Sequence, residues 1–321
     1  MKTVWFAGVS STKVGLGHLA RILALAEQFR SKGVICCFQH MCIFDNRGKE
    51  LLYESQFEYT CNCSGLPDLI VIDSYDSVYI ENCIRSTNAR SLLIVDETSP
   101  EVFADYYVEA SPIRKWKPLN TNGQVFKFKH NPILRETFDK PLILENPKNY
   151  QLKVLITLGA TELDYEILEV LIHSIRKFTI FSKCITVVSS NLETRERLGK
   201  AFPDDLKLIS NFSFFKDVLR NFDFVISAGG VTAWELISLG VPGMLIGVAD
   251  NQYYQISYLQ KHGLRDGINY RKSDKFQDEI STILNLALQD SNIIHLKRKK
   301  LRNGRIEVVN WVLDIMKYYQ R

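Results

Sequence analysis

Short apolar runs rich in β-branched residues alternate with amphipathic segments along this chain, and the whole alternation occurs twice. In the first half the runs cover 3–9, 33–40, 67–75 and 90–98. An amphipathic segment from His18 to Lys32 follows the first run. Because strands that alternate with helices form parallel sheets covered by those helices, the first half is predicted to be a doubly wound α/β domain.

The same order restarts after 139–151, a polar stretch with two prolines that we interpret as a linker. Helices are expected over 167–178 and at the C-terminal end, near Gln320. Strands are expected at 152–160, 183–190, 206–210, 222–230 and 243–248. A chain of 321 residues also exceeds what one core usually serves. We therefore predict two Rossmann-like domains, 1–145 and 150–321, that face each other across a ligand-binding cleft. The second domain is predicted to carry the C-terminal helix.

Composition narrows the class of protein. The net charge of +4 disfavours nucleic acid as a partner but suits an anionic substrate. Seven cysteines without a C-x-x-C pair predict no disulfide framework, no metal site and reduced thiols in the cytoplasm. The first residues lead directly into a strand pattern, so no leader peptide is expected. No apolar run approaches the ~18 residues of a membrane span, so no stable membrane insertion is expected.

The first strand is followed by G-x-G-x-x-A, which begins at Gly15. A dinucleotide-binding fingerprint needs its first glycine at the strand end and an acid about 20 residues later. Here "SSTKV" intervenes and the second strand carries no acid, so a nicotinamide cofactor is disfavoured. Gly15 and Gly17 predict a tight turn that lets the backbone approach a ligand. His18 then lies in the first helical turn, where the positive helix end favours a neutral base facing the cleft. The alternative is a histidine that only caps or packs the helix.

A second glycine turn, "SAGG", lies between a strand and a helix in the stretch 225–252. Free N–H groups at such a helix start can bind a phosphate without a cation. Glu235, in the helix, could accept the hydroxyls of a ribose or simply be a solvated carboxylate. A polar loop is expected where the strand 243–248 ends, and its residues could contact ligand or form a turn or helix cap. The predicted ligand contacts of this half are Gly229, Gly230, Val231, Glu235, Asp250, Asn251 and Gln252.

The two glycine blocks, "VGLGHLARILALA" and "VISAGGVTAWELISLGVPGMLIGVADNQ", resemble a nucleotide-sugar hydrolase family of pseudaminic acid biosynthesis. That family cleaves UDP-2,4-diacetamido-2,4,6-trideoxy-β-L-altropyranose and is related to the MurG-type glycosyltransferases of GT-B fold. Stretches at 69–82, 92–100, 133–138 and 154–163 fit as well, and the resemblance extends to about residue 265.

The resemblance implies a UDP-sugar substrate, a GT-B-like fold and hydrolysis by water without a metal or cofactor. The family's base falls on His18, and its further catalytic positions fall on Tyr75 and Asn251. Its uridine side falls on Gly229, Gly230 and Glu235. One departure stands out, because the family's first strand ends in a pattern such as R-A-D-A-S and this chain has "FAGVSS" at 6–11.

Two other functions fit the same residues. A GT-B glycosyltransferase would use the same donor site with an acceptor hydroxyl in place of water. The basic run 296–305 could then rest on an anionic membrane surface, or it could be the solvated face of the last helix. A nucleotide-sugar binding protein without catalysis would bind UDP and have no turnover to lose on replacement of His18.

Overall fold

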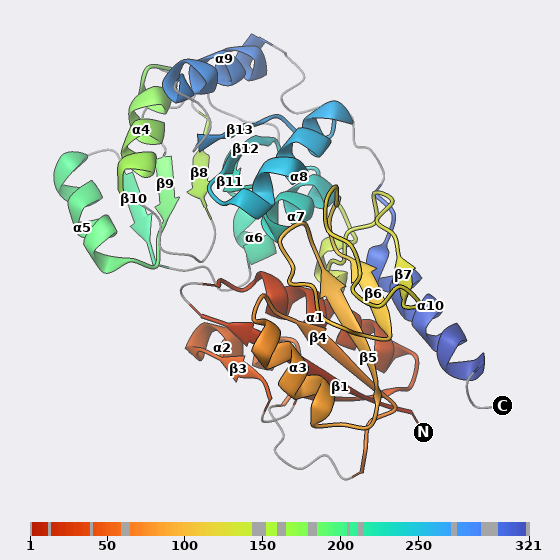
Figure 1. The fold of residues 1–321 in the computed structure, drawn as a ribbon. Coiled ribbons are helices and arrows are strands. Elements are labelled where there is room, and N and C mark those ends of the chain that lie inside the picture. The colour runs from red at the N-terminus through yellow and green to blue at the C-terminus, as the bar shows by residue number, and fades with distance from the viewer. Residues whose placement is uncertain are drawn as a thin grey trace. The chain divides into compact units, whose positions relative to one another are not determined.

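The computed structural model describes residues 2–11, 14–38, 41–58, 65–142, 152–158, 165–178, 185–203, 206–210, 215–270, 275–289 and 301–318. The chain divides into two units (Figure 1). Unit 1 comprises Met1–Asp139 and Leu301–Arg321, and unit 2 comprises Lys140–Lys300.

Unit 1 is built on a parallel sheet with the strand order β2-β1-β4-β5-β6-β7, and a short strand, β3, pairs with the end of β1. The strands are β1 (Thr3–Ser10), β2 (Ile35–Phe38), β3 (Ile43–Phe44), β4 (Leu69–Asp73), β5 (Arg90–Val95), β6 (Tyr106–Glu109) and β7 (Gln124–Phe126). The chain reverses its direction of travel across the sheet beside β1, between β2 and β4. In open α/β sheets this reversal is where ligands bind.

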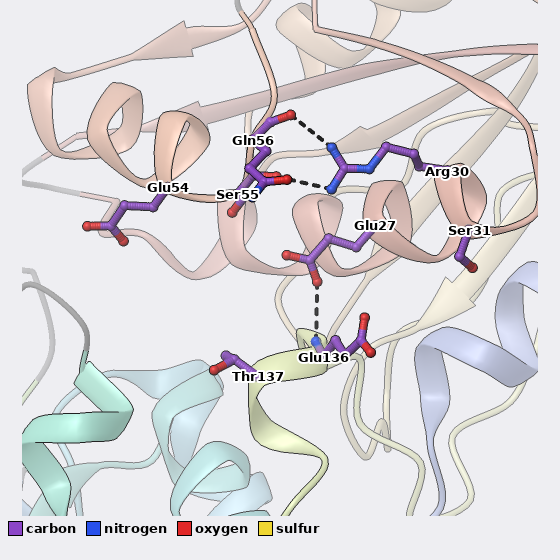
Figure 2. A pocket seen from close by; sticks show the side chains of 8 residues that line it. All are labelled: Glu27, Arg30, Ser31, Glu54, Ser55, Gln56, Glu136 and Thr137. Atoms are coloured by element: carbon purple, nitrogen blue, oxygen red, sulfur yellow. Dashed lines mark hydrogen bonds between the residues drawn. The ribbon is translucent and has the colours of Figure 1, made fainter.

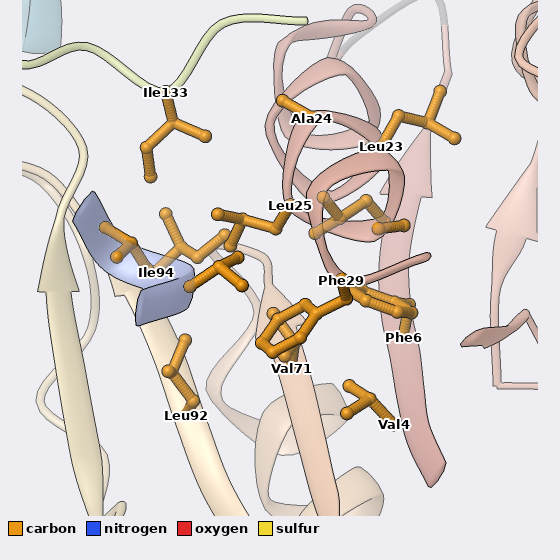
Figure 3. Packing of buried hydrophobic residues seen from close by; sticks show 14 of the residues in the cluster. Val4, Phe6, Leu23, Ala24, Leu25, Phe29, Val71, Leu92, Ile94 and Ile133 are labelled. Atoms are coloured by element: carbon orange, nitrogen blue, oxygen red, sulfur yellow. The ribbon is translucent and has the colours of Figure 1, made fainter. Parts of the chain in front are cut away.

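Both faces of this sheet are buried, as the continuous apolar runs predict for a parallel sheet. Along β1 successive side chains alternate between two cores: Val4 and Phe6 join one cluster, and Trp5 and Ala7 join the other. The first cluster lies under α1 (Gly17–Ser31), whose Phe29 packs against Phe6 at a ring-centroid distance of 6.2 Å (Figure 3). The second lies under α3 (Ser77–Arg85).

The C-terminal helix, α10 (Gly304–Tyr318), packs on the same core as α1 through Val308, Val309 and Val312. Its start is fixed by Arg305, which donates to both carboxylate oxygens of Asp139 at 2.6 and 2.7 Å. The last helix thus belongs to unit 1, whereas the predicted division placed it in the second domain. Its apolar stripe matches the exposed edge of the first core, a complementarity that spacing along the chain does not reveal.

Unit 2 contains a six-stranded parallel sheet within the described residues, in the order β10-β9-β8-β11-β12-β13. This is the strand order 3-2-1-4-5-6 of dinucleotide-binding folds. The strands are β8 (Val154–Thr157), β9 (Ile185–Val188), β10 (Leu206–Ile209), β11 (Phe224–Ala228), β12 (Gly243–Gly247) and β13 (Gly267–Asn269). The helices are α4 (Tyr165–Arg176), α5 (Leu192–Ala201), α6 (Phe215–Leu219), α7 (Val231–Leu239), α8 (Asp250–Lys261) and α9 (Phe276–Gln289).

The predicted strands are confirmed in place. Most are shorter than their apolar runs, whereas β1 extends one residue beyond its run, to Ser10. Several elements were not expected: β3, β6, β7, α5, α6, α8 and α2 (Asn46–Glu54). The starts of α2 and α5 carry local signals, since Asp45 accepts from Gly48 N at 2.9 Å and Asn191 accepts from Thr194 N at 3.0 Å. Most of the predicted linker lies outside the described residues.

The cysteines differ from the expectation of fully reduced thiols. Cys37 is disulfide-bonded. Cys36, Cys42 and Cys83 are free. The absence of a C-x-x-C pair therefore does not exclude a disulfide, because folding can bring together cysteines that are apart in the sequence.

The basic run 296–305 is not the solvated face of a helix in its described part. Arg302 pairs with Glu307 at 2.7 Å and precedes α10, and the Arg305 side chain is only 4% exposed. Among the described residues, no helix has the length and hydropathy required to cross a bilayer.

Candidate functional site

The turn after β1 brings His18 to the carboxyl edge of the unit 1 sheet. Gly15 N donates to Ser11 O at 2.7 Å, and Gly15 has φ of 78°, a conformation that favours glycine. Gly17 was predicted to form the tight turn together with Gly15, but it is the first residue of α1 and lacks a positive φ. The turn closes a small loop and starts the helix, so His18 lies in the first helical turn as predicted.

His18 is buried against an aspartate at the end of a neighbouring strand. The imidazole is 3% exposed, and its Nδ1 forms a short hydrogen bond with Oδ1 of Asp73, the last residue of β4. A carboxylate can only accept, so we assign the hydrogen to Nδ1 and the lone pair to Nε2. A histidine oriented in this way by a buried carboxylate is suited to take a proton at Nε2.

Arg21 completes this pair from the next turn of α1. Its Nε donates to Asp73 Oδ2 at 2.7 Å and its Nη2 to Asp73 Oδ1 at 2.8 Å. Burial alone would raise the pKa of Asp73, but the Arg21 guanidinium and the His18 imidazole hold it below its usual value. Burial would likewise lower the pKa of Arg21, and Asp73 instead raises it. Both members of the ion pair are therefore charged.

Tyr75 and Asp96 form the other side of the cluster. The Tyr75 ring lies edge-on to the His18 ring, with centroids 4.5 Å apart, and its hydroxyl donates to Asp96 Oδ2. Burial, followed by the negative charge of Asp96, raises the pKa of Tyr75, so the phenol stays protonated and acts as a donor. Asp96 follows β5 and accepts from Thr98 N at 3.0 Å. The segments at the carboxyl ends of β1, β4 and β5 thus bring five side chains together: His18, Arg21, Asp73, Tyr75 and Asp96.

Three members of this cluster were not singled out from the sequence: Arg21, Asp73 and Asp96. The two aspartates each end a continuous apolar run, "LIVID" and "LLIVD". An acid at that position emerges at the carboxyl edge of a parallel sheet, so this signal could have found both. Arg21 follows His18 by three residues, the spacing of neighbours on one helix face.

In unit 2 the predicted glycine turn joins β11 to α7. Gly230 is the N-cap of α7 and makes no side-chain cap. A Cβ on Gly229 would lie 2.8 Å from Ile256 Cδ1 and 3.2 Å from Gln252 Cβ, so glycine is needed there for packing of α8. Gln255, which the sequence analysis did not single out, donates to Gly229 O at 2.5 Å and to Gly230 O at 3.0 Å. The Gln255 side chain of α8 thereby stabilises the turn through its two carbonyl oxygens.

The remaining predicted contacts of unit 2 lie at three kinds of position. Val231 begins α7, and Glu235 lies in the same helix with 8% exposure, which excludes a solvated carboxylate. Asp250, Asn251 and Gln252 form the first turn of α8 instead of a loop. Gln252 also accepts from Val248 N at 3.0 Å. Ala249, in an extended conformation two residues after β12, is the N-cap of this helix and makes no side-chain cap.

A separate pocket in unit 1, of about 380 Å³, contains none of the predicted site residues (Figure 2). Within it, Arg30 donates to Gln56 O at 2.8 Å, and Glu27 accepts from Glu136 N at 3.2 Å. Burial raises the pKa of Glu27. The lining residues are Glu27, Arg30, Ser31, Glu54, Ser55, Gln56, Glu136 and Thr137. The hydrogen bonds within this pocket link α1 to the segments around Gln56 and Glu136.

Comparison with known proteins establishes the fold. No family model matches the chain. An uncharacterized protein of Methanocaldococcus jannaschii is 25% identical over 266 residues, which are 74% of this chain and 54% of that protein. The chain therefore spans about half the length of the curated relative that it matches.

Solved structures match over nearly the whole chain. MurG of Acinetobacter baumannii has 14% identity and a TM-score of 0.61, with 98% of this chain and 100% of that chain covered. S. aureus MnaA with UDP has 11% identity and a TM-score of 0.66, covering 100% and 97%. A Listeria monocytogenes protein, provisionally assigned as a UDP-N-acetylglucosamine 2-epimerase, has 12% identity and a TM-score of 0.65. The match covers 100% of this chain and 97% of that chain. The predicted fold class is confirmed: two parallel-sheet α/β domains of the GT-B type.

Proposed function

We propose that this chain is an enzyme that uses a UDP-sugar and that His18 is its general base. The observation that carries the proposal is the hydrogen bond between His18 Nδ1 and Asp73, which leaves Nε2 as the proton acceptor. Asp73 is itself held by two hydrogen bonds from Arg21. A neutral histidine merely packed in a core would not need a buried carboxylate whose charge is in turn balanced by a buried arginine.

The chemistry that this base supports is attack of an oxygen nucleophile on the anomeric carbon. His18 Nε2 takes the proton of the nucleophile as its oxygen bonds to the carbon, and the bond from that carbon to the UDP oxygen breaks with inversion. UDP leaves with the electron pair. We assign its diphosphate to the start of α7, where the first backbone N–H groups of the helix can donate to a departing negative charge. The Gly229 N–H donates to Ile246 O at 3.2 Å and is not one of these groups. Asn251, in the first turn of α8, and Tyr75 are the further catalytic positions in this proposal.

Glycosyl transfer is the first candidate, with an acceptor hydroxyl as nucleophile. The fold supports it, because a MurG is among the structures most similar to this chain. Hydrolysis is the second candidate, with water as nucleophile. It is supported by the resemblance of the "GLGH" and "SAGG" blocks to the hydrolase family. In that case the substrate would be the UDP-diacetamido-trideoxy-altropyranose of that family.

The test is release of UDP from a panel of UDP-sugars, that altropyranose included, with and without candidate acceptor alcohols. NMR follows the anomeric configuration of the product. UDP release that needs an acceptor and gives an inverted glycoside supports transfer. Release without an acceptor, giving the inverted free sugar, supports hydrolysis. UDP binding with no release from any donor contradicts both candidates and leaves a binding protein.

A further inference from the structure

Arg21 is a buried cation between two buried carboxylates. Arg21 is 9% exposed, and its guanidinium donates to both carboxylate oxygens of Asp73. Its Nη1 lies 3.7 Å from Oδ2 of Asp96, and its Nη2 lies 3.0 Å from Nδ1 of His18. Asp73 is 1% exposed and Asp96 is 4% exposed. Isolated charges at this depth are costly, so the sum of the charges in the cluster matters.

The sum depends on the protonation state of His18. The described groups that contact the imidazole are Arg21 on its own helix, Asp73 at the end of β4 and Tyr75 after β4. Asp96, after β5, joins this cluster through Arg21 and the Tyr75 hydroxyl. Tyr75 is neutral, so two carboxylates face one guanidinium. With neutral His18 the cluster has one excess negative charge, and with His18 protonated its charges balance.

We infer that Arg21 and Asp96 are positioning residues that set the proton affinity of His18 from opposite directions. The inference deepens the proposed function, on which it rests, by assigning a role to two residues that do not touch the reacting atoms. Arg21 keeps Asp73 ionised and in place for His18, and its charge opposes the imidazolium. Asp96 supplies the charge that balances the cluster after proton transfer, and it orients Tyr75 against the imidazole.

This division of roles predicts shifts of opposite sign. Loss of the Arg21 charge removes repulsion from the imidazolium, so Arg21→Met raises the pH midpoint of the His18 ring titration. Loss of the Asp96 charge removes attraction, so the isosteric Asp96→Asn lowers that midpoint. A single nearby charge typically produces about 1–3 pH units. Arg21→Lys keeps the charge and leaves the midpoint near that of the wild type.

The experiment is an NMR pH titration of full-length protein labelled in the histidine rings. His18→Gln identifies the His18 signals among those of the six histidines. Arg30→Met is the matched control, since Arg30 lies on the same helix but donates to backbone oxygens of Ser55 and Gln56. This control leaves the midpoint unchanged. Midpoints equal to the wild type in folded Arg21→Met and Asp96→Asn overturn the inference. If Arg21→Met does not fold, an unmoved midpoint in Asp96→Asn alone overturns it.

Kinetics of Arg21→Lys separate positioning from stability. An ammonium cannot hold both oxygens of Asp73 in the bidentate geometry of a guanidinium. We expect kcat to fall about 10-fold or more with KM unchanged, the signature of an interaction made in the transition state. Wild-type kcat in Arg21→Lys contradicts the positioning role. The titration needs no turnover, so an inactive wild type with the predicted shifts overturns only the proposed function.

Discussion

The two units use parallel sheets in similar ways but equip the carboxyl edges of those sheets with different chemistry. In unit 1 the edge carries a cluster of charged and aromatic side chains around His18. In unit 2 the edge carries a glycine turn and two glutamines that bond to backbone groups. Side chains that change protonation state are needed for proton transfer, whereas backbone N–H groups suffice to hold an anion. Under the proposed function, the strand ends of unit 1 supply the reaction and those of unit 2 supply the binding.

The largest expected effect tests the charge cluster of unit 1. Asp73→Asn leaves Arg21 buried without its main partner, and breaking a buried ion pair in this way typically costs about 3–5 kcal/mol. Urea unfolding measures the loss. Asp68→Asn is the control, because the Asp68 side chain is exposed and accepts from Thr3 N at 2.7 Å. Equal unfolding free energies for Asp73→Asn and the wild type would break the distinction between the two edges.

The same variant carries a pH prediction. The pKa of Asp73 is lower in the folded protein than its unfolded value of about 3.9. Its ionisation therefore stabilises the fold fully above that value, and the contribution is lost as the pH falls through the folded pKa. The gap in unfolding free energy between wild type and Asp73→Asn should shrink as the pH falls below about pH 4. A gap that is independent of pH down to the acid transition contradicts the assignment.

A smaller effect is expected in unit 2, on binding instead of stability alone. Gly229→Ala places a Cβ 2.8 Å from Ile256 Cδ1 and forces α8 away from the turn. Overpacking of this kind costs about 1–3 kcal/mol. We expect weaker UDP binding by calorimetry, by about 10-fold for 1.4 kcal/mol. Gly199→Ala in α5 is the control, because its Cβ would meet only Leu208 Cδ1 at 3.5 Å. Unchanged UDP affinity in Gly229→Ala removes this turn from the binding site.

Gln255→Ala should have the smallest effect of the series. It deletes the two hydrogen bonds to Gly229 O and Gly230 O, each of which contributes about 0.5–1.5 kcal/mol. The turn loses support but keeps its sequence, so UDP affinity should fall a few-fold. Gln260 lies on the same helix as Gln255 but donates to Gly267 O of β13, so Gln260→Ala should leave UDP affinity as it is. Equal losses in the two variants would mean that α8 stability, and not the turn, controls binding.

Much of the fold follows from the sequence, because the apolar runs are long enough to mark each central strand. Strand β6 and the edge strand β7 were not predicted, since four and three residues give no clear periodicity. The start of α8 was interpreted as a loop because "ADNQ" has residues typical of turns. Which unit receives the last helix depends on complementary apolar surfaces, and these exist only once both partners are folded.

The site was predicted in part. His18 and the glycine turns follow from local spacing, and Tyr75 came only from the resemblance to a family. Asp73 and Asp96 were accessible through their place after apolar runs. The bidentate contact of Arg21 was not, because a helix spacing of three does not say which strand end the side chain reaches. The disulfide of Cys37 likewise depends on long-range folding that a count of cysteines does not capture.

The most direct test of the account is a single-turnover comparison of wild type and His18→Gln with a UDP-sugar substrate identified in the release assay, alongside UDP binding by calorimetry. A positioned general base contributes about 10²–10⁴-fold to the rate. The account predicts that His18→Gln loses that factor in the rate of UDP release and binds UDP as tightly as the wild type. His173→Gln, on the exposed side of α4, should match the wild type in both. A His18→Gln enzyme that releases UDP at the wild-type rate would contradict the assignment of the chemistry to unit 1.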